Sequence, residues 1–225
     1  MTTPPELAWE LKERARSEDS ADDEYEASDP LTRAFFAARL RLFASVADMS
    51  LPKGGAPRIL DAGCGDGYLL EGLQARLSGR TPAYYGCDFA LTRAVRARGR
   101  AAGARVLLAN LKSLPFPTGT FDLVTCTDVL EHVEEPHQAV YEFGRILKPG
   151  GAMLIAVPHE GWWRFCRAVL LRFPLQIPGH INRLSPSWVR SLLPSWEVAA
   201  LRHMPIAWMP WALSLHGTIL LRKPR

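Results

Sequence analysis

The chain has 225 residues, enough for one domain with a substantial hydrophobic core. Hydrophobic residues make up 48% of it and charged residues 22%, a balance that excludes disorder for most of the chain and excludes fibrous and repeat architectures. Apolar runs fall short of the roughly 18 residues of a membrane-spanning helix, and the N-terminus lacks the apolar core of a secretory signal, so we expect a cytoplasmic protein. The cysteines lie far apart without a CxxC pair, which predicts neither a zinc site nor a disulfide framework.

Charge is distributed unevenly along the chain. Residues 1–29 hold ten acidic and three basic side chains, a net charge of −7, whereas residues 161–225 hold one acidic and nine basic side chains, a net charge of +8. Six of the seven tryptophans also lie in residues 161–225. We interpret residues 1–29 as an acidic, mobile leader and residues 30–225 as a single domain. A basic, tryptophan-rich region can face an acidic substrate or lipid headgroups, or simply carry solvated arginines.

Residues 31–47 have apolar side chains at helical spacing and predict an amphipathic helix with an inward face of Leu31, Phe35, Ala38, Leu42 and Val46. Strands then alternate with helices. The predicted strands are 58–61, 83–88, 104–109, 121–127, 152–158, 196–204 and 214–223, and the predicted helices are 67–78, 90–102, 136–147 and 186–193. This rhythm indicates an α/β fold with a doubly wound, mainly parallel, seven-stranded sheet. Residues 161–180 are expected to form a helical lid insert before the last two strands.

A glycine-rich loop follows the first predicted strand, in the sequence ILDAGCGDG of residues 59–67. Glycines let the backbone approach a nucleotide-like ligand closely at the carboxyl end of a strand. A nicotinamide-binding loop shares part of this pattern. However, Asp61 would place a negative charge beside a pyrophosphate, and the GxGxxG spacing is absent. The acidic loop therefore favours a cationic ligand.

Asp88 ends the second predicted strand, 21 residues after Gly67. At that position a carboxylate can accept both ribose hydroxyls of an adenosine, and Phe89 can lie against the purine. Asp88 can also cap the helix predicted over 90–102, and the two roles are compatible.

Four segments in order, ILDAGCGDG, YYGCD, LPFPTGTFDLVTCTDVLEHVEEP and RILKPGGAMLIAVP, resemble the class I S-adenosylmethionine-dependent methyltransferases, a group that includes ubiquinone- and menaquinone-pathway enzymes. The resemblance covers about residues 56–158 and implies a Rossmann-like methyltransferase fold with S-adenosyl-L-methionine as cofactor. The cofactor-binding residues it implies are Asp61, Gly63, Cys64, Gly65, Asp88, Phe89, Asn110, Leu111, Thr127 and Asp128. Asn110 stands where the family has an acid, but its carbonyl oxygen can still accept a hydrogen bond from the adenine amine.

Asp128, Glu131 and His132 form a cluster of reactive side chains. If a helical turn starts at Asp128, both carboxylates share one face with the imidazole beside them. The stretch is similar to the ExxEH metal site of small-RNA 2′-O-methyltransferases and some quinone-pathway O-methyltransferases, with His180 as a further ligand. The alternatives are a structural Glu–His pair and a general base at His132, and we expect no metal.

Methyl transfer to a hydroxyl requires removal of a proton, and His132, His159 and His180 are the candidate catalytic bases. We expect a small apolar or aromatic acceptor rather than nucleic acid. Residues 161–180 could cover this acceptor, lie on a membrane surface or simply pack on the sheet. Two other function classes stay open at this point: a non-catalytic module that binds the adenosyl cofactor, and a nicotinamide-dependent oxidoreductase.

Overall fold

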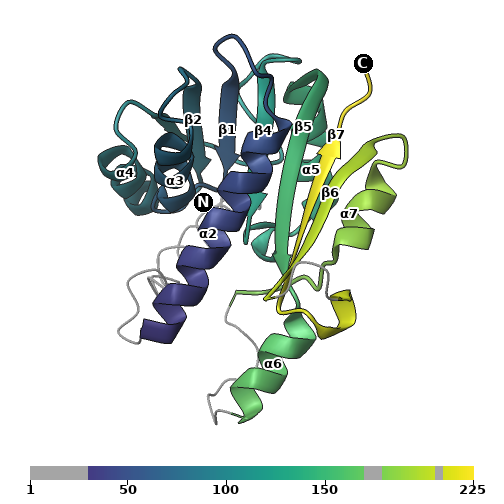
Figure 1. The fold of residues 1–225 in the computed structure, drawn as a ribbon. Helices are drawn as coiled ribbons and strands as arrows, with labels where there is room; N and C mark the ends of the chain where they lie inside the picture. Colours follow the sequence, from purple (N-terminus) through teal and green to yellow (C-terminus); the bar gives the residue numbers. More distant parts are fainter. Residues whose placement is uncertain (1–29, 170–178, 206–209) are drawn as a thin grey trace, which may run out of the picture.

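The computed structural model describes residues 30–169, 179–205 and 210–225 (Figure 1). The leader predicted at residues 1–29 and the stretch 170–178 of the predicted insert lie outside the described residues, as do residues 206–209.

One seven-stranded sheet runs through the molecule in the order β3-β2-β1-β4-β5-β7-β6. Its strands are β1 Arg58–Ala62, β2 Ala83–Asp88, β3 Arg105–Leu108, β4 Phe121–Thr127, β5 Leu147–Pro158, β6 Glu197–Met204 and β7 His216–Arg222. Strands β1 to β5 are parallel, and β7 lies antiparallel between β5 and β6. This arrangement confirms the doubly wound, mainly parallel α/β fold.

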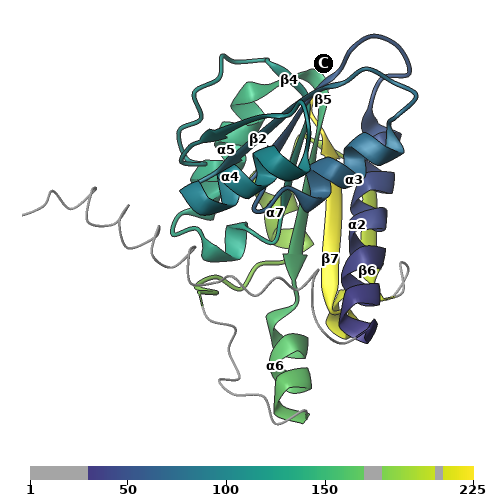
Figure 2. The same cartoon turned by 90° about the vertical axis from the view of Figure 1, so that its left-hand side faces the viewer.

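Helices cover both faces of the sheet (Figures 1 and 2). They are α2 Pro30–Ser50, α3 Tyr68–Arg76, α4 Leu91–Arg100, α5 Pro136–Ile146, α6 Glu160–Val169 and α7 Pro186–Leu192, with short 3-10 turns η1 Leu130–His132 and η2 Trp211–Leu213. Helices α2, α3 and α4 lie on one face and α5 and α7 on the other, whereas α6 extends from the end of β5 away from the sheet. Among the described helices, none combines the length and apolar character needed to cross a bilayer.

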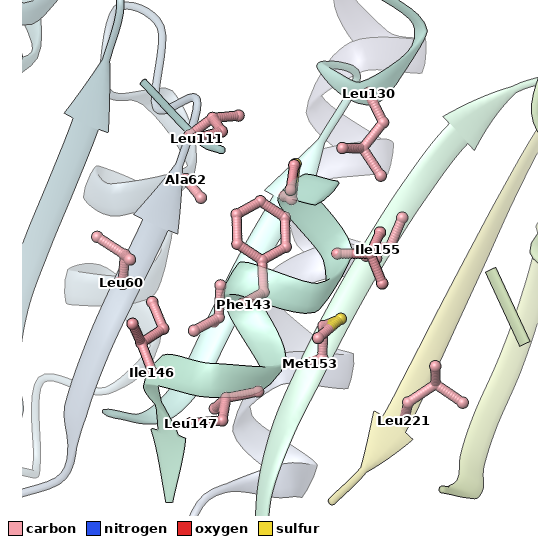
Figure 3. Close-up of a cluster of buried hydrophobic side chains, with 14 of the residues drawn as sticks. Leu60, Ala62, Leu111, Leu130, Phe143, Ile146, Leu147, Met153, Ile155 and Leu221 are labelled. Atoms are coloured by element: carbon pink, nitrogen blue, oxygen red, sulfur yellow. The ribbon is translucent and has the colours of Figure 1, made fainter. Parts of the chain in front are cut away.

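The core forms two layers because successive side chains of a strand point to opposite faces. On the α5 face, Leu60, Met153 and Ile155 pack with Phe143 and Ile146 (Figure 3). On the α2 face, the strand residues that alternate with these pack against helices α2 and α3. They include Ile59, Leu123 and Leu154. Both faces are covered, which explains why the central strands are apolar almost without alternation.

Helix α2 turns a different face to the sheet from the one its spacing predicted. The fully buried side chains include Phe36, Arg39 and Phe43, whereas Phe35, Ala38 and Leu42 are half-buried. The predicted inward face is therefore correct at Val46, which is buried, and displaced by about one residue at Phe35, Ala38 and Leu42. Apolar residues lie on nearly all sides of this helix, so spacing alone does not select the face, and packing against α3 and the sheet decides it.

Strand β5 begins at Leu147, five residues before the predicted start at 152. Leu147 pairs with Phe121, and a register shift follows between Phe121 and Leu123 of β4. The Lys148 ammonium binds the Asp122 carboxylate at 2.7 Å, which holds this irregular stretch on the sheet. The residues Pro149, Gly150 and Gly151 therefore lie within β5, and the strand begins before them.

The two glycines at the start and middle of α3 provide a matched test of the local backbone. Gly67 has a φ of +87°, and a Cβ there would lie 2.8 Å from the Ala97 Cα, so Gly67→Ala should destabilise the fold by about 2 kcal/mol or more. A Cβ at Gly72 meets nothing within 4 Å, so Gly72→Ala inside the helix should stabilise it by about 0.5–1 kcal/mol. Urea unfolding of both variants checks this, and a Gly67→Ala protein as stable as the wild type would contradict it.

Candidate active site

The glycine loop between β1 and α3 is folded against the end of β2. The amides of Gly63 and Cys64 both donate to the Cys87 carbonyl, at 2.8 and 2.9 Å. Gly63 and Gly65 have φ values of +78° and +51°, in the left-handed region that favours glycine. A Cβ on Gly63 would lie 2.4 Å from Cγ2 of Val129, so the loop also closely approaches the segment after β4.

Asp88 holds this loop with its side chain. One carboxylate oxygen accepts the Gly65 amide at 2.8 Å and the other accepts the Ala90 amide at 2.9 Å, just before α4. Burial raises the pKa of Asp88 although these two amides, and Arg93 nearby, counteract it. Each carboxylate oxygen has a second lone pair, so Asp88 can bind further hydroxyl groups while it holds the loop.

Asp61 lies in β1 and not at the mouth of the loop. Its buried carboxylate accepts a hydrogen bond from the Thr125 hydroxyl of β4 at 2.7 Å. Burial, counteracted by Thr125 and reinforced by the charge of Asp88, raises the pKa of Asp61 to about 7. Its position is therefore beneath the glycine loop, between the two central strands.

The predicted adenine-side residues follow β2 and β3. The Asn110 side-chain oxygen accepts the Lys112 amide at 2.9 Å, so part of its acceptor capacity is used within its own turn. Leu111 is buried, and Phe89 is half-buried at the end of β2. All the predicted cofactor-binding residues thus lie on β1 or at the carboxyl ends of β1 to β4, the edge at which parallel α/β sheets bind ligands.

Asp128 leaves the end of β4 with a φ of +57° and contacts two cationic or titratable side chains. One carboxylate oxygen lies 2.9 Å from the Arg39 guanidinium, and the other contacts Nε2 of His216. Burial alone would raise the pKa of Asp128, but Arg39 and His216 outweigh this and lower it to about 2. The turn η1 starts only at Leu130, so the expected helical face shared by Asp128 and Glu131 is wrong.

A second cluster consists of Glu131, His132 and His180, whose nearest nitrogen and oxygen atoms lie within 4.8 Å of one another. Glu131 is 1% exposed, and within the described part of the chain neither of its carboxylate oxygens has a hydrogen-bond partner. Burial, together with the charge of Asp128, raises the pKa of Glu131 well above its usual range. Burial also lowers the pKa of His132 to about 4, and its Nδ1–H donates to the Gly179 carbonyl at 3.0 Å.

His180 is oriented by Glu160, the first residue of α6. The distance between His180 Nδ1 and a Glu160 carboxylate oxygen is 2.5 Å, and both side chains are buried. The backbone next to His180 is fixed as well, because the amides of Ile181 and Asn182 both donate to the Glu131 carbonyl. The structure therefore brings His180 beside Glu131 and His132 from a distant part of the sequence.

His159, the third predicted base, has its described contacts elsewhere. Its Nδ1 accepts the Trp162 amide at 3.3 Å at the start of α6, and its ring lies 4.6 Å from that of Trp211. Sequence reasoning missed Arg39, Glu160 and His216. A charged residue between Phe36 and Phe43 on a helix was the available signal for Arg39. Glu160 also carried a signal, since it follows the fifth predicted strand at the edge of the sheet where ligands bind, whereas His216 carried none.

Comparison with known proteins agrees with this geometry. Residues 60–155 match the family described as "Methyltransferase domain". The chain is 35% identical over 118 residues to the ubiquinone biosynthesis O-methyltransferase of Xanthomonas oryzae pv. oryzae, which covers 50% of this chain and 48% of that protein. It is 30% identical over 149 residues to an uncharacterized methyltransferase of Mycobacterium bovis, covering 63% of this chain and 70% of that protein.

Solved structures show the same fold. The magnesium protoporphyrin IX methyltransferase from Synechocystis PCC 6803, with bound SAH, matches with a TM-score of 0.69 and 15% identity over 97% of this chain and 99% of that one. The N-methyltransferase NodS from Bradyrhizobium japonicum WM9 matches with a TM-score of 0.63 and 17% identity, over 85% and 98%.

The fold and these relatives define the chain as a methyltransferase-family protein. More narrowly, it belongs to the class I S-adenosylmethionine-dependent methyltransferases. The chain spans about half the length of the ubiquinone-pathway relatives that it matches.

The raised pKa of Asp61 predicts a pH-dependent stability. Between about pH 4 and pH 7 the folded protein keeps a proton that the unfolded chain has lost, so the free energy of unfolding falls as pH rises through this window. Asp61→Asn keeps an acceptor for Thr125 and cannot ionise. Relative to the wild type, it should gain roughly 2–3 kcal/mol between pH 5 and pH 8 in urea unfolding. Equal pH dependence of the two proteins would contradict the burial of an ionisable carboxyl at this position.

Proposed function

We propose that this chain transfers a methyl group from S-adenosylmethionine to a hydroxyl group of a small apolar or aromatic molecule. The observation that carries this proposal is the buried His180–Glu160 pair beside His132 and Glu131, in a chain segment whose Val129 contacts Gly63 of the glycine loop. Membership of the methyltransferase family supports the donor. The name of the Xanthomonas relative, an O-methyltransferase, supports oxygen as the accepting atom.

The glycine loop and Asp88 would hold the cofactor. The residues present fit this group, since Asp88 keeps lone pairs for two ribose hydroxyls, and a Cβ on Gly65 would reach no closer than 3.6 Å to another group. When bound, S-adenosylmethionine supplies an electrophilic methyl group on a cationic sulfur. Thr127 and the anionic Asp128, at the end of β4, would lie on the side of that positive charge. Phe89, Asn110 and Leu111 would line the adenine.

The proposed proton acceptor is Nε2 of His180. When the His180 imidazole is neutral and its Nδ1–H donates to Glu160, Nε2 is the nitrogen that can accept a proton, and the carboxylate would stabilise the resulting imidazolium. As the acceptor oxygen takes the methyl group that bound S-adenosylmethionine would supply, the hydroxyl proton would pass to Nε2 of His180. His132, kept neutral by its low pKa, and Glu131, kept protonated by its high one, would orient the hydroxyl by hydrogen bonds.

Helix α6 is proposed to bind the apolar part of the acceptor. It starts at Glu160, in the site, and extends away from the sheet (Figures 1 and 2). Its side chains include Trp162, Trp163 and Phe165, and Phe165 is 57% exposed. An apolar surface that begins at the proton acceptor suits an aromatic molecule bearing a hydroxyl group.

A second candidate is that Glu131, His132 and His180 hold a divalent cation. The orphaned, buried Glu131 carboxylate and the closeness of the three donor groups favour this. One carboxylate and two imidazoles suit Zn²⁺ or Mn²⁺, which would lower the pKa of a bound hydroxyl. Asp128 is not part of this donor set, because it binds Arg39 and His216.

Asp88→Ala tests the cofactor site. Loss of charge-assisted hydrogen bonds to two hydroxyls should weaken binding of S-adenosylhomocysteine by about ten- to a hundredfold in calorimetry. Asp66→Asn is the matched control, since this carboxylate is on the same loop but binds Arg96 at 3.2 Å. Asp88→Ala binding as tight as that of the control would remove Asp88 from the site.

The proton acceptor is tested by release of S-adenosylhomocysteine with catechol and 3,4-dihydroxybenzoate as probe acceptors. His180→Ala should lower the rate at pH 7 by about a hundredfold and Glu160→Gln by about tenfold. Both losses should shrink above pH 9, where the phenol ionises without help. A pH-independent loss would contradict a base at His180. Loss of wild-type activity with a chelator, restored by Mn²⁺, would favour the metal site instead.

A further inference from the structure

Asp128 connects three elements that are distant in the sequence. Its carboxylate binds Arg39 of α2 at 2.9 Å and contacts His216 of β7, and its amide donates to the Ala156 carbonyl of β5 at 3.1 Å. Arg39 is 5% exposed and His216 is fully buried. A buried guanidinium requires an anion close by, and removal of the Asp128 carboxylate would cost Arg39 this ion pair. We call these three side chains the Arg39–Asp128–His216 triad.

The backbone at Asp128 is itself unusual. Its φ of +57° is the single positive value at a non-glycine residue in the described part of the chain. A non-glycine residue in this conformation is strained and persists only where its surroundings hold it. Arg39 of α2 and His216 of β7 both bind the Asp128 carboxylate and hold Asp128 in this conformation.

The backbone conformation at Asp128 affects two parts of the proposed site, the glycine loop and the segment that carries His180. The next residue, Val129, packs on Gly63 of the glycine loop. Two residues later, the Glu131 carbonyl accepts the amides of Ile181 and Asn182, which position the segment that carries His180. A rotation at Asp128 would therefore move the surface against the glycine loop and the proton-acceptor cluster together.

We propose that the Arg39–Asp128–His216 triad positions the backbone at Asp128. This backbone in turn fixes the position of the cluster of Glu131, His132 and His180 relative to the glycine loop. Arg39 and His216 act through Asp128 and are positioning residues. The consequence for methyl transfer rests on the proposed function. The relative position of the glycine loop and the cluster does not rest on the proposed function, because it is a property of the protein without ligand. The alternative is an ion pair that only fastens α2 to the sheet and affects stability alone.

The test combines calorimetry with S-adenosylhomocysteine and hydrogen exchange at residues 129–132. Arg39→Gln, Asp128→Asn and His216→Gln should each weaken binding about tenfold and speed exchange at these amides. The double variant Arg39→Gln/Asp128→Asn should bind S-adenosylhomocysteine no more weakly than the single variant with the lower affinity. The effects are not additive because both substitutions remove the same interaction. Arg39→Lys, which keeps the charge, should recover part of the affinity. The control is Asp48→Asn, which breaks the ion pair of α2 with Arg76 at 3.1 Å, away from the site.

Several results would overturn the proposal. Additive effects of Arg39→Gln and Asp128→Asn would show that the two residues act separately. Unchanged affinity and exchange in Asp128→Asn, or variants that lower only the melting temperature as the control does, would reduce the triad to a structural ion pair. If Arg39→Gln does not fold, unchanged binding and unchanged exchange in His216→Gln decide against it. A wild-type protein that does not bind S-adenosylhomocysteine contradicts the proposed function, and the exchange experiment then still tests the relative position of the glycine loop and the cluster.

Discussion

Three backbone amides of the glycine loop are satisfied by acceptors at the end of β2: the Cys87 carbonyl receives two and the Asp88 carboxylate receives one. Without these acceptors, a loop rich in positive φ values would have many competing conformations. Ala62 at the end of β1 pairs with Cys87 at the end of β2. This register places the Cys87 carbonyl and the Asp88 carboxylate beside the loop that follows β1, so it determines where the loop lies. The position of α3 and the space proposed for the adenosyl group follow from this fixed loop.

The other half of the site depends on the backbone of Glu131 as much as on its side chain. Its carbonyl receives two amides from the segment after residue 178, and the Asn182 amide group adds a bond to the Val133 carbonyl at 2.5 Å. These bonds bring the imidazole of His180 against that of His132, with ring centres 4.6 Å apart. Burial raises the pKa of Glu131 and lowers the pKa of His132, so that both side chains are uncharged at pH 7.

Features that depend on neighbouring residues could be predicted from the sequence. The strand–helix alternation and the place of Asp88 at the end of β2 were both predicted from local patterns. The partners of Asp128 and His180 could not be predicted. They depend on which elements the fold brings together, and no spacing rule joins Arg39 to His216. The buried face of α2 was predicted only in part for a related reason, since an ambiguous apolar pattern is resolved by tertiary contacts.

The place of β7 has a consequence for the order of assembly. Strand β6 precedes β7 in the chain, but within the described sheet it pairs with β7 alone. During synthesis β6 must therefore wait without a strand partner until β7 has left the ribosome and inserted between it and β5. The β1–β5 half can form earlier, so for a time the edge of β5 is open to unwanted pairing. His216 also arrives with β7, so Asp128 receives its imidazole partner only when this last strand is inserted.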